Sequence, residues 1–232
     1  MPETNSANRL LAALPKKDLN DLLQKMERVP LIYEEHVYEA GSFINHVYFP
    51  ESGIISLLSR VDEHSTIEVG IVGNEGMAGL PIFLGVKQSA NVAVVQGAGT
   101  ALRMKTTDFL HECNNGNRLA RPLLRFMHSL MAQISQSAAC NRFHPIEARL
   151  ARWLLMTQDR MHADEFQITQ GFLSNMLGVR REAVNKAAGD LQRHKLISYS
   201  RGILDVIDRK GLEKAACPCY IIIKKEYDDF GF

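Results

Sequence analysis

The sequence predicts an α+β fold in which a β-rich N-terminal part, one long helix and a C-terminal helical unit with a hairpin follow one another. Short β-rich segments separated by glycines run from Val29 to Met104. Apolar residues recur at helical spacing from Leu119 to Cys140. Two short amphipathic segments between Thr169 and Gln192 are then followed by a hairpin pattern. Together these patterns predict an α+β chain.

Length and composition indicate an ordinary globular protein of one or two domains. The chain has 232 residues, of which 46% are hydrophobic and 23% charged. Its first residues, MPETNSANRLL, contain no long apolar run, so we expect no signal peptide. No segment approaches the roughly 20 apolar residues of a membrane span. The 4 cysteines are too few for a disulfide framework, so we expect a reduced, cytoplasmic protein.

The N-terminal part is predicted to form helices and then a β-roll. Asn5 to Arg28 is helical in pattern, with two leucine-rich clusters on either side of Pro15. The glycine-punctuated segments that follow predict an antiparallel roll or barrel. The loop from Gly73 to Gly79 matches neither a dinucleotide-binding nor a phosphate-binding motif. No catalytic motif is present elsewhere, so we expect no enzyme.

The long helix carries two apolar stripes. Leu119, Leu123, Phe126 and Leu130 repeat at four-three-four spacing, which suits a coiled-coil seam. A second stripe lies beside it and contains Leu124, Met127, Met131 and Ile134. One stripe can pack on the parent domain while the other meets an identical helix, although burial of the whole helix in one domain fits the periodicity equally well. Pro122 suits a first turn, so the regular helix should begin near Arg121.

A further amphipathic helix from His144 to Met161 leads into the helical pair. It carries the apolar residues Ile146, Leu150, Trp153, Leu154 and Leu155. A tryptophan at this spacing is more often part of the core than of a site. The polar segment from His162 to Glu165 is interpreted as a link.

The helical pair has the features of a helix-turn-helix. Thr169 can cap the first helix, and Gly178 can end it in the left-handed conformation. The second helix has an apolar face for docking and a polar face for base edges. The apolar face consists of Val184, Ala187, Ala188 and Leu191. A hairpin turning at Arg201-Gly202 follows, which completes a winged helix.

Basic charge is concentrated around the second helix, as a phosphate-binding surface requires. Six basic and two acidic residues lie between Gly178 and Arg201, whereas the whole chain carries only +1. An ordinary helical hairpin with a solvated polar face is the alternative, and the basic excess and the wing argue against it. The residues expected to contact DNA are Thr169, Gln170, Arg180, Arg181, Glu182, Asn185 and Lys186.

Helix-turn-helix proteins usually bind two half-sites as dimers, which favours a dimerising role for the long helix. The partners expected are therefore double-stranded DNA with an inverted repeat and a second copy of the chain. The residues expected at the dimer contact are Leu119, Leu123, Phe126, Leu130 and Ile134.

This order of parts resembles the Crp–Fnr superfamily of bacterial transcription regulators. The resemblance covers nearly the whole chain and is most specific in Gly178 to Lys186, followed by Leu191 and Leu196-Ile197, and in the roll segment Gly41 to Gly53. It implies a cyclic-nucleotide-binding-like jelly-roll with N-terminal helices in residues 1–116, a dimerisation helix in 117–142 and a winged helix-turn-helix in 143–232. Contacts with RNA polymerase are implied as well, without assigned residues.

The resemblance also assigns roles in the second helix. Arg181, Glu182 and Lys186 stand where the family carries Arg-Glu and a later basic residue. By chemistry, Arg181 can donate to guanine, Glu182 can accept from cytosine, and Lys186 can reach a base or phosphate. Arg180 departs from the family, which usually has a small capping residue there. Gly189 inside the helix costs about 1 kcal/mol relative to alanine.

The effector region departs further from the family's cyclic-AMP-responsive members. Their Gly-Glu pair for the ribose falls at Ala78-Gly79, and their Arg-Ser/Thr pair for the phosphate falls at Gln88-Ser89. Neutral Gln88 cannot replace an arginine in bidentate contact with phosphate. We therefore expect weak or no cyclic-nucleotide binding. The residues expected at an effector site are Ala78, Gly79, Leu80, Gln88, Ser89 and, on the long helix, Ser135.

No cofactor or metal site is expected. The N-terminal cysteine cluster of the iron–sulfur members is missing, and a four-thiolate cluster would need all 4 cysteines, which are scattered. Cys217 and Cys219 are the one close pair and are expected to be reduced residues of a terminal strand, with a metal or redox site the less common alternative. Haem ligation stays open, although no spacing favours it among His46, His64, His111 and Cys113.

Two functions from different classes compete. The first is a homodimeric, sequence-specific DNA-binding regulator that responds to an unidentified effector. The second is a ligand-binding regulatory module that acts through a protein partner and uses the winged helix for docking. The basic excess favours the first.

Overall fold

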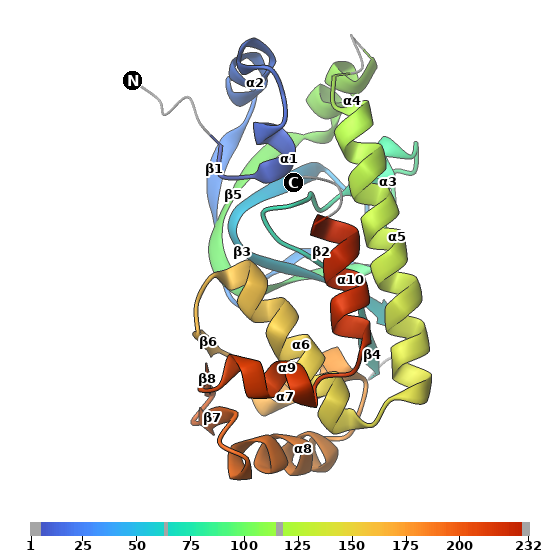
Figure 1. The fold of residues 1–232 in the computed structure, drawn as a ribbon. Coiled ribbons are helices and arrows are strands. Elements are labelled where there is room, and N and C mark those ends of the chain that lie inside the picture. Colours follow the sequence, from blue (N-terminus) through green and yellow to red (C-terminus); the bar gives the residue numbers. More distant parts are fainter. Residues whose placement is uncertain (1–5, 63–64, 115–117, 229–232) are drawn as a thin grey trace.

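The computed structural model describes residues 6–62, 65–114 and 118–228. It shows a β-roll above a winged helix-turn-helix unit, with one long helix running past both (Figure 1). The expected α+β class is therefore confirmed, with the antiparallel sheet N-terminal and the helix-turn-helix C-terminal. The predicted boundary between residues 116 and 117 lies outside the described residues, as does Asn5. Among the described helices, none combines the length and apolarity needed to cross a bilayer.

The N-terminal segment forms two short helices and does not continue as helix to Arg28, where the sequence pattern predicted its end. α1 (Arg9–Ala12) is capped by Asn8, whose side chain accepts from the Leu11 amide. α2 (Lys16–Leu23) follows Pro15, and β1 (Glu27–Leu31) begins three residues after its C-cap, Gln24. The predicted helix is therefore too long at its C-terminal end, because residues 27–31 pair with a later strand.

The roll is built on two long, bent strands. Its sheet has the order β1-β5-β3-β4 with β2 also pairing with β5, and all pairs are antiparallel. The strands are β2 (His36–Tyr38), β3 (His46–Arg60), β4 (Thr66–Val72) and β5 (Val92–Lys105). The sequence predicted short β-rich segments separated by glycines, whereas β3 and β5 are 15 and 14 residues long. Register shifts near Gly53 let β3 bend and continue instead of ending, which is the usual effect of a β-bulge.

Helices close the roll and join it to the C-terminal unit. α3 (Leu80–Phe83) and α4 (Thr106–Asn114) flank the roll, and α5 (Ala120–Phe143) runs the length of the molecule. Gly76, in the loop after β4, lies so close to α5 that an added Cβ would stand 2.1 Å from a ring carbon of Phe126. The absence of a side chain at Gly76 therefore allows the roll to pack directly on the long helix.

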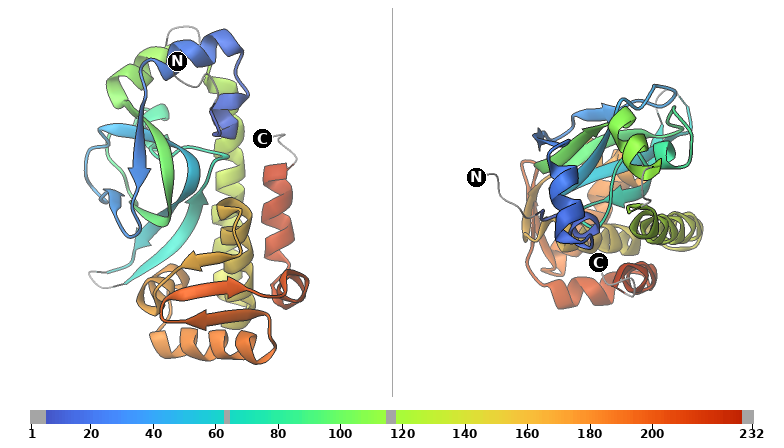
Figure 2. Two further views of the ribbon diagram at one scale, coloured as in Figure 1. Left: turned by 90° about the vertical axis from the view of Figure 1, so that its left-hand side faces the viewer. Right: turned by 90° about the horizontal axis from the view of Figure 1, so that it is seen from above.

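The C-terminal unit packs under the roll and against the long helix. Its helices are α6 (Ile146–Met161), α7 (Gln170–Leu177), α8 (Arg181–Arg193), α9 (Arg209–Ala215) and α10 (Cys219–Asp228). A small sheet of order β6-β8-β7 joins β6 (Glu165–Gln167), β7 (Ile197–Ser200) and β8 (Ile203–Val206). α10 lies alongside α5 (Figure 2), where the Tyr227 hydroxyl donates to Gln133 at 2.6 Å.

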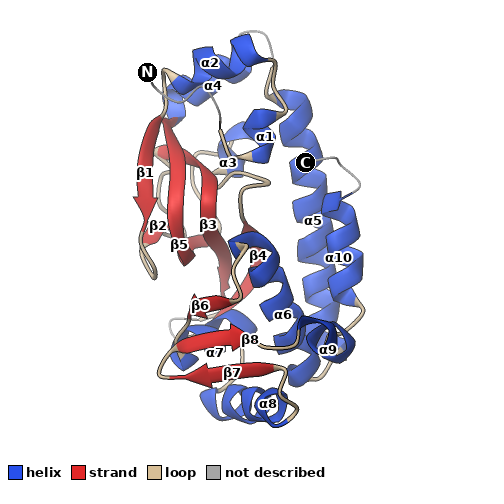
Figure 3. Cartoon of the chain, turned by 60° about the vertical axis from the view of Figure 1, so that its left-hand side comes forward, coloured by secondary structure: helices blue, strands red, loops and turns tan. Residues whose placement is uncertain are grey.

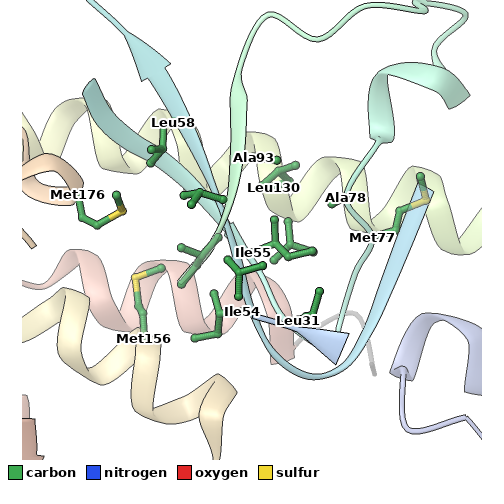
Figure 4. Packing of buried hydrophobic residues seen from close by; sticks show 14 of the residues in the cluster. Leu31, Ile54, Ile55, Leu58, Met77, Ala78, Ala93, Leu130, Met156 and Met176 are labelled. Atoms are coloured by element: carbon green, nitrogen blue, oxygen red, sulfur yellow. The ribbon is translucent and has the colours of Figure 1, made fainter. Parts of the chain in front are cut away.

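One hydrophobic core connects the roll with the helices. Leu31 and Ile54 of the roll, Leu130 of α5, Met156 of α6 and Met176 of α7 belong to a single cluster of buried residues (Figure 4). The roll therefore contacts the helix-turn-helix through packed side chains as well as through the chain connection. A change in the conformation of the roll can therefore reach the helix-turn-helix through these packed side chains.

Candidate nucleic-acid interface

The turn between α7 and α8 has the geometry that the sequence predicted. The Thr169 hydroxyl accepts from the Phe172 amide at 3.1 Å and caps α7. Gly178 ends that helix with φ of 61°, in the left-handed region that glycine adopts without strain. An added Cβ there would also lie 2.7 Å from Ile67 of β4, so glycine serves both the turn and the contact with the roll.

α8 presents opposite faces to the core and to solvent, at the end of the molecule beneath the small sheet (Figure 3). Its four predicted docking residues, from Val184 to Leu191, are all buried. Each of the seven residues expected to contact DNA is exposed. All seven side chains are therefore accessible to solvent, while their DNA contacts stay a prediction.

The N-terminal end of α8 combines basic charge with open backbone donors. Arg180 occupies the N-cap position, and its side chain makes no capping hydrogen bond to any described residue. The Ala183 amide bonds to the Arg180 carbonyl at 3.0 Å, whereas the amides of Arg181 and Glu182 can meet a phosphate. The Arg181 guanidinium lies beside Gly171, where an added Cβ would meet it at 2.8 Å. At the far end, Arg193 pairs with Asp190, so its charge is partly compensated within the helix.

The wing has a tight turn that its two central residues explain. Arg201 and Gly202 have φ values of 51° and 80°, and a two-residue hairpin with both angles positive matches the twist of its strands. β6 adds a third strand on β8, and only its first residue, Glu165, belongs to the predicted polar link. A three-residue strand with an apolar centre at Phe166 gives too short a pattern to identify.

The roll contacts the beginning of α7 at one of the predicted DNA-contact residues. The Thr169 amide donates to the Tyr33 hydroxyl at 3.1 Å, and the Tyr33 ring lies 5.4 Å from that of Phe172. Burial raises the pKa of Tyr33. The Thr169 hydroxyl also lies 3.4 Å from the Glu34 carboxylate. In this arrangement the roll occupies a backbone donor that could otherwise meet a phosphate.

A cavity of about 130 Å³ separates the roll from α5. Four of the six predicted effector residues line it, namely Ala78, Gly79, Leu80 and Ser89. Gln88 and Ser135 are exposed and do not line this cavity, so their role at an effector site stays a prediction. Gln88 instead bridges to Phe43 at the roll surface, and Ser135 lies on the outer face of α5.

The walls of this cavity are apolar or neutral. Tyr38 and Asn91 supply polar groups beside Ser89, and α5 contributes Leu130 and Ile134. Burial raises the pKa of Tyr38 to about 12, so its hydroxyl keeps its proton at neutral pH. None of the described residues that line the cavity carries a charge at that pH. The cavity therefore offers hydrogen bonds and apolar contact to a ligand, without a charge for a phosphate.

The structure corrects the dimer contact predicted on α5. Leu119, Leu123, Phe126 and Leu130 are buried in the core of their own chain, so they are not available to a partner. Ile134, also expected there, is half-buried and lines the cavity. Periodicity could not separate the two stripes, because both have the same spacing. The second stripe is the accessible one, with Leu124 51% and Met131 60% exposed.

A polar network joins the roll to α6. The Trp153 indole donates to Glu68 at 3.0 Å, and the Ser56 hydroxyl lies 2.8 Å from the other Glu68 oxygen. Ser56 also lies 2.6 Å from Gln96, whose amide donates to Thr157 at 2.7 Å. Burial raises the pKa of Glu68 to about 7, against the opposing effects of hydrogen bonds and of nearby Arg152. Sequence patterns did not find this network, because its members come from three strands and a helix.

The structure gathers three of the four cysteines, which the sequence analysis expected to hold no metal. Cys140, Cys217 and Cys219 are buried together with half-buried His144. The potential ligand atoms of these four residues all lie within 4.8 Å of one another. Cys219 begins helix α10, so the expected terminal strand is wrong. The Cys217 thiol, 3.4 Å away, lowers the pKa of Cys140 by donating to its sulfur.

The residues considered for haem do not gather in this way. His46 lies in β3, and His111 and Cys113 lie in α4. None of them belongs to a group of three or more potential metal ligands in the described part of the chain. His64 lies outside the described residues.

A family model matches the C-terminal unit in sequence, and solved structures match most of the chain in fold. Residues 148–215 match the family model of the Crp-like helix-turn-helix domain. This range includes α7, α8 and the wing. No curated protein is significantly similar to the chain in sequence.

Solved structures share the fold over most of the chain. FixK2 from Bradyrhizobium japonicum is 13% identical with a TM-score of 0.69, and the match covers 83% of this chain and 98% of that one. The c-di-GMP-responsive global regulator CLP of Xanthomonas campestris is 13% identical with a TM-score of 0.68, covering 83% and 99%. A CRP-family transcriptional regulator from Thermus thermophilus is 22% identical with a TM-score of 0.63, covering 82% and 96%.

Proposed function

Given a Crp-like helix-turn-helix domain on the fold of Crp/FNR-family regulators, we propose that this chain is a homodimeric, sequence-specific DNA-binding transcription regulator. The observation that carries the proposal is the exposed face of α8. It combines a guanidinium, a carboxylate, an amide and an ammonium on a helix whose opposite face is buried in the unit. These are the groups that read base edges in the major groove.

The second stripe of α5 supports the dimer. Leu124 and Met131 expose large apolar side chains on a helix that otherwise packs on its own domain. Covering such a stripe with an identical helix would remove it from water and set two α8 helices against two half-sites. Replacing both residues with glutamate should give a monomer in analytical ultracentrifugation. Ile32→Glu, at a residue 58% exposed on the roll, is the matched control and should remain dimeric.

The cavity between the roll and α5 is the proposed effector site, and cyclic AMP is not its ligand. At about 130 Å³ it is smaller than the roughly 300–1,000 Å³ of ordinary ligand sites, and its described walls carry no basic residue for a phosphate. A small, mostly apolar molecule fits this chemistry better. Calorimetric titration with cyclic AMP should give no binding in the micromolar range, and a micromolar affinity would overturn this part of the proposal.

An effector there would act by shifting populations. Leu130 and Ile134 bring α5 into the cavity wall, and the roll holds α7 through Tyr33 and Thr169. A ligand that prefers one arrangement of roll, long helix and helix-turn-helix stabilises that arrangement by its differential affinity. DNA, which competes for the α7 amide, would favour an arrangement without the Tyr33 contact.

Selection from random duplex DNA tests the proposal. Purified chain, without added effector, should enrich a two-fold symmetric site whose halves lie about one helical turn apart. Enrichment of an asymmetric site, or salt-insensitive binding to a protein partner with no DNA enrichment even after cell extract is added, would contradict it. The second of these results would favour a regulatory module that acts through a protein.

A further inference from the structure

The geometry points to a structural zinc site formed by Cys140, His144, Cys217 and Cys219. The four residues come from two places in the chain. Cys140 lies in the last turn of α5, and His144 is the C-cap of that helix. Cys217 lies between α9 and α10, and Cys219 is the first residue of α10. Three thiolates and one imidazole form a ligand set that structural zinc sites commonly use.

The distances fit one tetrahedral ion. Zinc bonds of about 2.3 Å to sulfur and about 2.0 Å to imidazole nitrogen place tetrahedral ligand atoms roughly 3.5–3.8 Å apart. The Cys140 and Cys217 sulfurs are 3.4 Å apart, and the Cys219 sulfur is 3.5 Å from His144 Nδ1. With all four atoms within 4.8 Å of one another, only sub-ångström to ångström-scale adjustments separate this cluster from a closed site. In a [4Fe–4S] cluster the ligands bind different irons and stand farther apart.

The surroundings of the cluster suit a site with a net negative charge. Arg149 and Arg152 of α6 are only 7% and 5% exposed. Neither forms an ion pair with a carboxylate in the described part of the chain, and the Nε atom of each has no hydrogen-bond partner there. Both interact electrostatically with the thiols of Cys140 and Cys217. A divalent ion with three thiolates carries one negative charge, which would offset buried guanidinium charge that is otherwise costly.

Hydrogen bonds from neighbouring groups hold Cys217 and Cys219 in place. The Gln136 side-chain amide donates to the Cys219 sulfur at 3.1 Å. Hydrogen bonds of this kind commonly orient the ligands of a metal site. The Cys217 amide donates to the Ala148 carbonyl at 3.3 Å, which fixes the loop before α10 against α6. The cysteines are also separate from the main core, since their cluster of buried residues contains only these three. The arrangement is therefore local and self-contained.

The ion would hold together the joint between the long helix and the C-terminal unit. His144 and Pro145 connect α5 with α6, and the link before α10 returns to the same point. On the proposed function, this linkage would fix the pose of the helix-turn-helix relative to the long helix. That consequence depends on DNA binding, whereas the metal site itself does not, so a metal assay separates the two.

The test is the metal content of the purified full-length chain, measured by inductively coupled plasma mass spectrometry. We expect one zinc per chain, lost in Cys217→Ser and in His144→Asn. Cys113→Ser is the matched control, because this cysteine lies in α4 outside the cluster and should leave the zinc in place. Arg152→Met, which removes a neighbouring guanidinium and none of the four ligands, should weaken zinc binding by about 10- to 100-fold, the range usual when a residue next to the ligands is replaced.

Cobalt substitution keeps the test valid if a cysteine variant fails to fold. Wild-type chain reconstituted with Co²⁺ should show sulfur-to-cobalt charge transfer and the visible bands of tetrahedral cobalt. Three results with the wild-type chain would overturn the site: a metal-free chain that takes up neither ion, iron with inorganic sulfide in place of zinc, or a Cys140–Cys217 disulfide in the chain purified under reducing conditions. Zinc retained by both ligand variants would overturn it too.

Discussion

Replacing Glu68 with glutamine should change how the stability of the chain depends on pH. Glu68 lies where β4 meets α6 and accepts from the Trp153 indole. The Ser56 hydroxyl has one proton and two acceptors within reach, Glu68 and Gln96. When Glu68 is ionised, Ser56 can donate to only one of these two acceptors, and the other lacks a hydrogen bond from Ser56. With Glu68 protonated, its own hydroxyl can donate to Ser56, and Ser56 can donate to Gln96.

Glutamine reproduces the protonated arrangement at every pH. Its carbonyl can accept from Trp153, and its amide can donate to Ser56. The substitution therefore removes the ionisation while it keeps the hydrogen bonds and nearly the same volume. Arg152 and Arg160, the charged groups near the carboxyl, lower its pKa, but burial outweighs them.

The magnitude follows from the pKa of Glu68, which rises from 4.5 in the unfolded chain to about 7 in the fold. Between these values the folded state holds a proton that the unfolded state has released, so the free energy of unfolding falls as pH rises. Below about pH 4.5 the carboxyl is protonated in both states, and above about pH 7 it is ionised in both. The full difference is at most about 3 kcal/mol, at 1.36 kcal/mol for each pKa unit.

Urea unfolding followed by circular dichroism between pH 5 and pH 8 measures this effect. We expect Glu68→Gln to differ from wild type by about 1 kcal/mol or less near pH 5 and to be more stable above pH 7 by up to about 3 kcal/mol. Glu35→Gln, which alters an exposed carboxyl of the roll, should follow the wild-type profile. Parallel profiles for wild type and Glu68→Gln would refute the reasoning, because Glu68 would then ionise alike in both states.

Three other substitutions test contacts between the roll and the helices. Glu75→Ala should lower the free energy of unfolding by about 3–5 kcal/mol, because it leaves the charge of Arg160 buried without its partner. The two side chains are 2.7 Å apart, with Glu75 5% and Arg160 9% exposed. A loss below about 1 kcal/mol in urea unfolding would contradict this. Gly76→Ala should lower the free energy of unfolding by about 1–3 kcal/mol, since the new methyl group would overlap the Phe126 ring. An unchanged urea midpoint would contradict this, because α5 would then move away from the methyl group at no cost. Tyr33→Phe frees the Thr169 amide and should strengthen DNA binding by about two- to tenfold in a fluorescence anisotropy titration, whereas weaker binding would mean that the contact supports the DNA-binding pose.

Local signals in the sequence predicted the helix-turn-helix well. Thr169 and Gly178 mark the ends of α7 because capping and left-handed geometry depend on single residues. The buried face of α8 follows from helical spacing alone. The wing could be found because Arg201-Gly202 suits a turn between two short β-rich segments.

Features that depend on contacts distant in the sequence were missed. Cys140 and Cys217 are 77 positions apart, and the Cys217-Pro-Cys219 spacing is shorter than that of common zinc motifs. The raised pKa of Glu68 arises from burial under α6, which no local pattern encodes. The choice of buried stripe on α5 depends on Gly76 meeting Phe126, so helical periodicity alone left it open.

The central claim is that the exposed face of α8 reads bases, and Arg181 tests it most directly. The affinities of wild type and Arg181→Ala should be compared on the selected DNA site and on every single-base variant of it. We expect Arg181→Ala to lose about 1–3 kcal/mol and to relax the preference at one base pair in each half-site. Arg193→Ala, at the far end of α8 and paired with Asp190, should keep the base preference unchanged. Equal weakening of Arg181→Ala on all sequences would contradict the claim, because Arg181 would then contact only the phosphates.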